Sequence, residues 1–444
     1  MPAHMIDHKG HVLRAWAMAL VALGLVSSAI GQTITEYPLT TAGSNPIGIT
    51  AGPDGNLWFT EYGGANNIGR ITLDGNVTEF PIPTLDASPV GIAAGPDGNL
   101  WFAEHRGRRI GRITPSGVIT EFPVPGGLAN PGFITTGPDG NLWFTEVAGN
   151  SIWRVTPSGV FTEFRLPTLN SSDGTIAVGS DGNLWFTEWR YGNNIGRITP
   201  TGTITEFPIP TPSSGTFGIA AGPDGALWFT EADGNKIGRI TTSGEITEFP
   251  IPTPGSVPYG IVAGIDGNLY FAESEAAKIG RITTSGQITE FPIPTPGCFE
   301  GIASGPDGAI WFAEQCAAKI GRLSIGPLTC EPDATTLCLN ASRFRVTADW
   351  RKSDGTTGQG QAVPLTPDSG YFWFFNPANI EAVVKVLNAC AVNDHHWVFA
   401  AGLTNVEVTL RVVDTHTGSH KTYVNSLGTA FQPIQDTSAF PTCP

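Results

Sequence analysis

The stretch GIAAGPDGALWFTEADGNKIGRITTSG (residues 218–244), followed by EITEFPIP (residues 245–252), decides the fold because near copies of it recur along the chain. The glutamate that closes each LWFTE-like segment returns every 41 to 43 residues, at Glu61, Glu104, Glu146, Glu188, Glu231, Glu273 and Glu314. A period of about 40–45 residues with four short strands per repeat is typical of a β-propeller. We therefore predict an all-β chain dominated by a seven-bladed β-propeller over residues 32–326.

Each repeat is expected to hold four strands, named a (GIAAG), b (LWFTE), c (KIGRIT) and d (ITEFPIP). Strands c and d are joined by an x-Gly pair such as Asp74-Gly75, which indicates a two-residue hairpin. That turn would place Arg70 opposite Glu79. The same register predicts five further cross-strand ion pairs, namely Arg112–Glu121, Arg154–Glu163, Arg197–Glu206, Arg239–Glu248 and Arg281–Glu290.

The seventh repeat lacks a strand d, since SIGPL follows Arg322. The N-terminal segment Ile34–Pro38 resembles a strand d, and its Glu36 has no upstream arginine. We expect Glu36 to pair with Arg322, so that the N-terminal strand completes the last blade and closes the ring.

One mouth of the central channel is the predicted working face. The a–b turn, as in Pro53-Asp54-Gly55, is expected to be a three-residue loop centred on the aspartate. In each repeat, the residue that comes fourteen positions before the strand-b glutamate would then lie opposite that glutamate. This set comprises Ile47, Val90, Gly132, Gly174, Phe217, Tyr259 and Glu300.

The b–c loops line the same mouth, and two of them diverge from the repeat, at His105-Arg106 and Trp189-Arg190-Tyr191. Divergent loops on a repetitive scaffold commonly carry function. We therefore predict a ligand site formed by Phe217, Glu231, Tyr259, Glu273, His105 and Trp189. The alternative for the strand-b glutamates is structural, with each carboxylate bonded to a neighbouring blade.

The seventh repeat departs most from the others. The predicted register places Glu300 opposite Glu314, and two adjacent carboxyls either share a proton or bind a cation. Both residues are therefore candidates for catalysis and for metal binding. Cys298 and Cys316 would be cross-strand neighbours and are predicted to form a disulfide, although a bulge would shift the register by one. The alternative is that these two cysteines are not bonded to each other.

Between Ile34 and Ile325, the repeated GPDG-LWFTE, IGRIT and ITEFPIP motifs resemble the virginiamycin B lyase (streptogramin lyase) family. The resemblance implies a seven-bladed propeller that opens cyclic streptogramin B antibiotics by elimination across an ester bond, with Mg²⁺, acidic ligands and a histidine base. The family's histidine lies fourteen residues before the strand-b glutamate. Here that position holds Tyr259 in the sixth repeat and Glu300 in the seventh, while the glutamates themselves are present at Glu273 and Glu314.

Residues 1–31 are predicted to be a secretory signal peptide. Lys9 and Arg14 precede the apolar stretch Ala15–Val26, and Ala29-Ile30-Gly31 is a small-residue cleavage site. The alternative is a buried first helix or an uncleaved anchor.

Residues 327–444 lie outside the repeat and are predicted to form a small disulfide-stapled β-sandwich-like domain. Their four cysteines, Cys330, Cys338, Cys390 and Cys443, allow three connectivities. Strands are expected at 344–350 and 406–413, where apolar residues alternate. Asp394-His395-His396 is either a partial metal site or a solvated loop.

The chain has a formal net charge of −15 and six cysteines. The charge argues against nucleic acid as a partner, and the cysteines favour an oxidising compartment. We expect a secreted or periplasmic monomer without a membrane span. Three functions fit: a non-catalytic propeller that binds a small molecule, glycan or protein; a Mg²⁺-dependent carbon–oxygen lyase or lactone hydrolase that uses the mouth carboxylates; and a structural surface protein. The absent histidine favours the first.

Overall fold

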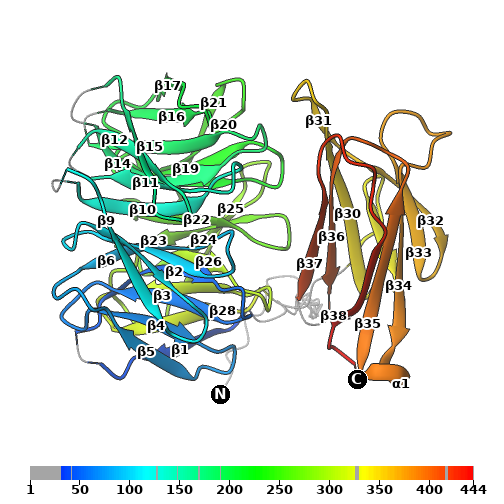
Figure 1. Ribbon diagram of the computed structural model, residues 1–444, viewed down its shortest axis with the longest axis horizontal. Helices are drawn as coiled ribbons and strands as arrows, with labels where there is room; N and C mark the ends of the chain where they lie inside the picture. The colour runs from blue at the N-terminus through cyan, green and yellow to red at the C-terminus, as the bar shows by residue number, and fades with distance from the viewer. Residues whose placement is uncertain are drawn as a thin grey trace, which may run out of the picture.

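The computed structural model describes residues 32–41, 43–126, 129–147, 149–168, 171–190, 192–325, 330–415 and 419–443. The predicted signal segment, residues 1–31, lies outside these ranges, as does Tyr191. The chain is almost entirely β-structure, and Figure 1 shows a ring of small sheets beside a two-layered β-structure.

The described part of residues 32–325 forms seven four-stranded antiparallel sheets, each of which is one blade. The inner strands are β2 (Pro46–Ala51), β6 (Pro89–Ala94), β10 (Pro131–Thr136), β14 (Ser171–Val178), β18 (Thr216–Ala221), β22 (Pro258–Ala263) and β26 (Ile302–Ser304). The second strands are β3 (Leu57–Glu61), β7 (Leu100–Glu104), β11 (Leu142–Glu146), β15 (Leu184–Arg190), β19 (Leu227–Glu231), β23 (Leu269–Glu273) and β27 (Ile310–Glu314). The third strands are β4 (Asn67–Ile71), β8 (Arg109–Ile113), β12 (Ser151–Val155), β16 (Asn194–Ile198), β20 (Lys236–Ile240), β24 (Lys278–Ile282) and β28 (Lys319–Leu323). The outer strands are β5 (Val77–Pro81), β9 (Ile119–Pro123), β13 (Phe161–Arg165), β17 (Ile204–Pro208), β21 (Ile246–Pro250), β25 (Ile288–Pro292) and β1 (Ile34–Pro38).

Inner strands of neighbouring blades approach closely, which explains the glycines in the GIAAG segment. A methyl group added at Gly218 would lie 2.4 Å from the carbonyl oxygen of Tyr259, and one at Gly260 would lie 2.3 Å from that of Glu300. Farther out, the wide strand-b side chain fills the space between blades. Trp185, for example, is fully buried against Ile219 and Phe229 of the next blade.

The N-terminal strand closes the ring, as predicted. Strand β1 pairs antiparallel with β28, and Tyr37 stacks on Trp311 at 5.7 Å between ring centroids. The predicted partner of Glu36 was wrong, however. Glu36 lies opposite Gly321, and its carboxylate accepts a hydrogen bond from the Lys319 ammonium at 2.6 Å, while Arg322 binds Asp307 at 2.7 Å.

The predicted register of the c–d hairpins was also wrong by one residue. The N–H of Thr72 donates to the carbonyl of Asn76, and the N–H of Gly75 donates to that of Thr72. The loop is therefore centred on Asp74, and Gly75 adopts a φ of 89°. This is the three-residue hairpin that ends in a left-handed glycine, rather than the two-residue form.

The shifted register gives the arginines and outer glutamates different partners from the predicted ones. In each of the six blades that contain this hairpin, the strand-c arginine lies opposite a threonine. The Arg239 guanidinium instead binds Asp224 of the a–b turn at 2.7 Å, and Asp224 also accepts the Trp228 indole N–H at 3.0 Å. The outer Glu248 accepts from the backbone and hydroxyl of Thr211, at 3.0 and 2.8 Å, in the segment that leaves the preceding blade. Six of the seven outer glutamates link neighbouring blades in this way, whereas Glu163 accepts from Ser151 of its own blade.

Residues 330–443 form a β-sandwich with a shared hydrophobic core, here called the C-terminal sandwich. Its first sheet contains β29 (Thr336–Leu339), β30 (Phe344–Arg351), β31 (Thr357–Gln359), β36 (Glu407–Asp414) and β37 (His420–Asn425). Its second sheet contains β32 (Gln361–Thr366), β33 (Ser369–Trp373), β34 (Ala382–Ala389), β35 (His395–Gly402) and β38 (Ile434–Phe440), with the short helix α1 (Cys390–Asn393) between β34 and β35. Both predicted strands are confirmed, as β30 and β36.

Two disulfides join cysteines of the C-terminal sandwich, Cys330 to Cys338 and Cys390 to Cys443. His396 lies beside the second of these and packs its ring against Phe344, with the centroids 4.9 Å apart. Within the described residues, no helix is long and apolar enough to cross a membrane.

Candidate functional site

The inner strands surround a narrow central channel. A cavity of about 140 Å³ runs along the axis between them, lined mainly by the glycines and isoleucines of the GI pairs. Two of the predicted site residues, Phe217 and Glu300, also line it. The sequence therefore placed these two side chains correctly at the channel, at the end where the inner strands begin.

The inner strands of the first six blades carry a bulge, so that Pro46 rather than Ile47 lies opposite Glu61. The last blade keeps the predicted register, since Ile302 lies opposite Phe312 and the N–H of Ala313 donates to the carbonyl of Gly301. The Glu300 carboxyl lines the channel, whereas the Glu314 carboxylate is buried without a hydrogen bond to a described residue. Burial alone raises the pKa of the Glu300 carboxyl.

The predicted disulfide between Cys298 and Cys316 is present next to Glu300. The N–H of Cys316 also donates to the carbonyl of Cys298. The disulfide ties the segment that carries Glu300 to the loop that follows strand β27.

Aromatic rings gather at the mouth of the channel. Phe217 is at the centre of the cluster, with edge-to-face contacts to Tyr259 at 4.9 Å, Phe133 at 5.3 Å and Trp189 at 5.7 Å between ring centroids. Three of these residues were predicted from the sequence. Phe133 was missed because it lies one position beyond the predicted set, inside the bulge.

Carboxylates surround the tyrosine of this cluster. Burial raises the pKa of the Tyr259 phenol, and the negative charges of Glu300, Glu275 and Asp233 raise it further. Asp233 and Glu275 are exposed on b–c loops. Sequence reasoning missed both because it examined the loops that diverge most. The mouth therefore combines aromatic rings with carboxylates whose charges act on Tyr259.

The strand-b glutamates do not reach this surface. Glu231 and Glu273 are fully buried, and neither carboxylate makes a hydrogen bond to a described residue. Burial raises the pKa of each to about 8, and the charge of the strand-d glutamate, Glu248 or Glu290, adds to this shift. Glu314 is similar, since burial raises its pKa to about 7. At pH 7 Glu231 and Glu273 are therefore largely protonated, and Glu314 is partly protonated.

His105 is partly buried at the mouth rather than aimed into the channel. It hydrogen-bonds to the backbone of Pro131 in the next blade, and burial lowers the pKa of its imidazole. It therefore fills the joint between two blades.

The mouth residues do not form a ready Mg²⁺ cage. Mg²⁺ requires near-octahedral oxygen ligands at close range. Among the described residues, the one group of three potential ligand side chains that converges is Cys390, His396 and Cys443, and both of its cysteines are in a disulfide. Neither Glu300 and Glu314 nor Asp233 and Glu275 converge in such a group.

Comparison with known proteins places this geometry in context. The model of the virginiamycin B lyase family matches residues 15–212 and 131–331. A solved streptogramin B lyase is 42% identical, with a TM-score of 0.63, and the match covers 66% of this chain and 97% of that chain. Virginiamycin B lyase from Staphylococcus aureus is 48% identical with the same TM-score, covering 66% and 100% of the two chains. A catalytically inactive histidine-to-alanine variant of the latter enzyme, solved with quinupristin, is 46% identical, with the same TM-score and coverage.

Proposed function

The chain belongs to the virginiamycin B lyase family, and we propose that its propeller binds a ligand at the aromatic mouth without the elimination reaction of the family. The observation that carries the proposal is Glu300 in the last blade. It occupies the position where the family resemblance places a histidine, and it lines the channel.

Elimination across an ester needs a base within hydrogen-bond reach of the proton that is removed, and imidazole suits this task near neutral pH. The sequence between residues 32 and 326 contains one histidine, His105, which is hydrogen-bonded to the Pro131 backbone. Glu300 and Glu314 were candidates for a carboxylate pair, but Glu300 lines the channel whereas the Glu314 carboxylate is buried without a described hydrogen-bond partner. What supports binding without elimination is an aromatic cluster at the mouth where the described residues offer no converging group of metal ligands.

The chemistry of the mouth indicates the kind of ligand. Phe217, Tyr259 and Trp189 offer ring faces and edges to apolar rings. Glu300, Asp233 and Glu275 add negative charge near Tyr259. We expect a small molecule with apolar rings and a cationic or hydrogen-bond-donating group. Quinupristin, present in the structure of the inactive relative, is a suitable first probe.

Export of the chain is part of the same proposal. Six cysteines form three disulfides, and the described residues contain no free cysteine. Such pairing is typical of an oxidising compartment. The measurement is the N-terminal sequence of the mature chain, which we expect to begin close to Gln32.

The central experiment is incubation of the full chain with quinupristin and Mg²⁺, followed by both calorimetry and mass spectrometry. We expect binding with the ring intact. Phe217→Ala should weaken binding about tenfold, which corresponds to ~1.4 kcal/mol. Phe375→Ala, a change of the same type at an exposed site in the C-terminal sandwich, should leave binding unchanged.

Ring opening that is abolished by Glu300→Gln or Glu314→Ala would contradict the proposal and establish a carboxylate-dependent lyase. A structural protein would be favoured instead if quinupristin did not bind, and if Phe217→Ala and Tyr259→Ala changed the binding of no ligand tested.

A further inference from the structure

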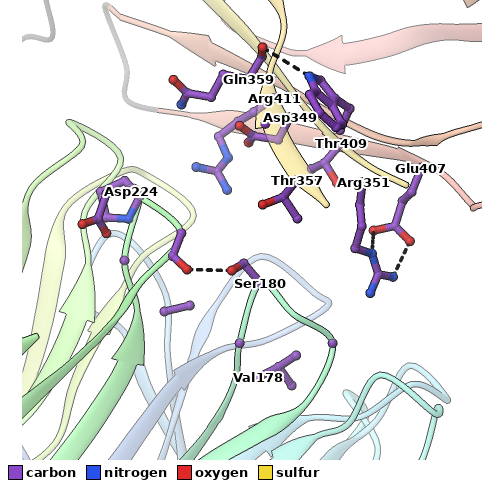
Figure 2. A pocket seen from close by; sticks show the side chains of 18 of the residues that line it. Val178, Ser180, Asp224, Asp349, Arg351, Thr357, Gln359, Glu407, Thr409 and Arg411 are labelled. Carbon is purple, nitrogen blue, oxygen red and sulfur yellow. Dashed lines mark hydrogen bonds and ion pairs between the residues drawn. The ribbon is translucent and has the colours of Figure 1, made fainter. Parts of the chain in front are cut away.

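A cavity of about 890 Å³ lies between the propeller and the C-terminal sandwich, where a polar face of the sandwich covers the a–b turns. Figure 2 shows the turns that carry Ser180 and Asp224 on one wall and strands of the first sandwich sheet on the other. Each carboxylate that lines this cavity is offset by a guanidinium, namely Asp224 by Arg239, Asp349 by Arg411 and Glu407 by Arg351. The charges of this cavity are therefore balanced within the chain.

The channel cavity is not balanced in this way. Among the described residues that line its volume of about 140 Å³, Glu300 is the one that carries a charge. Burial alone raises the pKa of its carboxyl, with no contribution from a cation of the described residues. The charges that act on the neighbouring Tyr259 are also all negative. An ionised Glu300 would therefore be stabilised by a cation that comes from a ligand.

The backbone acceptors at the mouth of the channel are already in use. In four blades the hydroxyl of the strand-b threonine donates to an inner-strand carbonyl of the next blade. The carbonyls that accept are those of Val90, Gly174, Phe217 and Tyr259. The carbonyl of Glu300 accepts from the N–H of Gly260 at 3.1 Å. A ligand N–H group that entered the channel would have to share these carbonyls or compete for the Glu300 carboxylate.

Aromatic rings stand where the channel opens. Phe133 and Phe217 both line the cavity, and their planes meet at 86°. Tyr259 and Trp189 meet Phe217 at 83° and 86°. Rings at right angles offer walls in two directions, as in the aromatic cages that bind quaternary ammonium groups. A ring face attracts a cation without a hydrogen bond, so this attraction needs none of the occupied carbonyls.

The volume of the channel cavity fits the head group of such a ligand. An apolar cavity of about 150 Å³ is known to hold one benzene molecule. A trimethylammonium group with its attached carbon has fewer heavy atoms than benzene. The rest of the ligand would lie outside the cavity, against the rings of Trp189 and Tyr259.

We propose that the channel mouth binds a quaternary ammonium group, with its trimethylammonium head beside Glu300 and against Phe133 and Phe217. The inference rests on the proposed function, because it names the chemical class of the ligand at the same aromatic mouth. A primary ammonium carries three N–H donors that need acceptors, whereas a quaternary one carries none. Histidine, which the family resemblance places at this position, carries no negative charge. The preference therefore follows from a residue particular to this chain.

The test is calorimetric titration of the full chain with choline. Two probes of similar size separate the terms: 3,3-dimethylbutanol, in which carbon replaces the charged nitrogen, and ethanolamine, which carries a primary ammonium. We expect choline to bind and both other probes to bind weaker by about tenfold or more. This comparison uses the wild-type chain, so it does not depend on how a variant folds.

Variants then locate the site. Glu300→Gln keeps the shape of the side chain and removes its charge, and it should weaken choline binding about tenfold, to the level of the neutral analogue. Phe217→Leu removes a ring and should weaken choline binding more than it weakens binding of the neutral analogue. Glu245→Gln removes the same charge from an exposed c–d hairpin, at the opposite end of the propeller from the mouth, and should change nothing.

Each of three results would overturn the inference. They are absence of choline binding by the wild-type chain, equal binding of choline and either other probe, and full choline binding by Glu300→Gln. The proposed function fails in a different way. Opening of the quinupristin ring would contradict that function whatever choline does, whereas quinupristin bound intact together with any of the three results would refute only the quaternary ammonium site.

Discussion

Two rings of glutamates run round the propeller: the strand-b glutamates, here called the inner ring, and the strand-d glutamates, here called the outer ring. In the sixth blade the pKa values of the two shift in opposite directions. In the sixth blade, Glu273 ends strand β23 and Glu290 lies on β25, with Lys278 of β24 between them. Burial raises the pKa of Glu273 to about 8. Burial also acts on Glu290, but hydrogen bonds from Lys278 and Thr253 outweigh it and hold the pKa of Glu290 below its usual value.

The difference shows that the lysine between two carboxyls hydrogen-bonds to only one of them, and that the geometry of the blade decides which one. The Lys278 ammonium lies 2.9 Å from Glu290, whereas the Glu273 carboxylate has no described hydrogen-bond partner. The fifth and seventh blades repeat the arrangement, with Lys236 on Glu248 and Lys319 on Glu36. In these three blades the strand-d glutamate therefore links to the preceding blade through a threonine, whereas the pKa of the strand-b glutamate is raised.

The largest expected effect tests the linking role of the outer ring. A chain that begins at Thr41 lacks β1, and with it Glu36, which binds both Lys319 and the backbone and hydroxyl of Thr295. We expect the propeller to lose cooperative folding, because the last blade then has an unpaired strand edge and lacks the hydrogen bonds between Glu36 and Thr295 of the blade before it. Thermal unfolding of this chain should be compared with that of a chain beginning at Gln32. Equal melting temperatures would show that β1 does not close the ring.

The second prediction concerns pH and tests the neutral state of the inner ring. The folded pKa values of Glu231 and Glu273, about 8, lie above the ordinary value of 4.5. Their contribution to stability is therefore complete below about pH 4.5 and is lost as pH rises through 8. Each group costs at most ~1.4 kcal/mol per pH unit in that window.

The lowered pKa values of Glu36, Glu248 and Glu290 act in the other direction, since their contribution is lost as pH falls below the unfolded value. We expect the free energy of unfolding, measured with denaturant, to be highest near pH 5 and to decline by several kcal/mol, roughly, toward pH 9. A stability that is constant from pH 5 to 9 would contradict the neutral inner ring.

The smallest expected effect separates the two rings in a single blade. Glu273→Gln replaces a protonated acid with a neutral amide of the same shape, and it removes the proton that wild-type Glu273 must take up on folding above pH 4.5. We therefore expect this variant to be more stable than the wild type, by up to ~3 kcal/mol at pH 7, with the full gain reached above pH 8. Glu290→Gln removes a charged acceptor and should cost ~1.5–3 kcal/mol at pH 7. Denaturant unfolding of both variants at pH 7 and at pH 9 measures the contrast.

Glu231→Gln and Glu248→Gln in the fifth blade serve as an independent repeat of this pair. If the inner variant proved as costly as the outer one at pH 7, the inner ring would be ionised and the proposed division of roles would be wrong.

The sequence predicted the features that depend on spacing alone. The repeat of 41 to 43 residues led to the propeller, the missing seventh strand d led to closure by β1, and symmetry about Asp307 led to the Cys298–Cys316 disulfide. It failed where one residue of register mattered. The left-handed glycine after Asp74 moved every arginine away from its predicted glutamate.

The candidate site was predicted in part for the same reason. Phe217 and Tyr259 were found because they interrupt a repeated position, and that signal requires no knowledge of contacts. Asp233 and Glu275 were missed, because their proximity to Tyr259 arises from loops of two different blades. The buried state of Glu231 and Glu273 was missed as well, since burial depends on how the blades pack.

By itself, the sequence determined the propeller, its closure and the absence of histidine at the family's position, because each follows from counting residues along a strict repeat. The tertiary structure alone decided which carboxyl each cation serves, how the aromatic rings meet at the mouth, and that a polar sandwich face covers the a–b turns. These depend on bulges, turns and contacts between segments far apart in the chain, which a change of one residue in register is enough to rearrange.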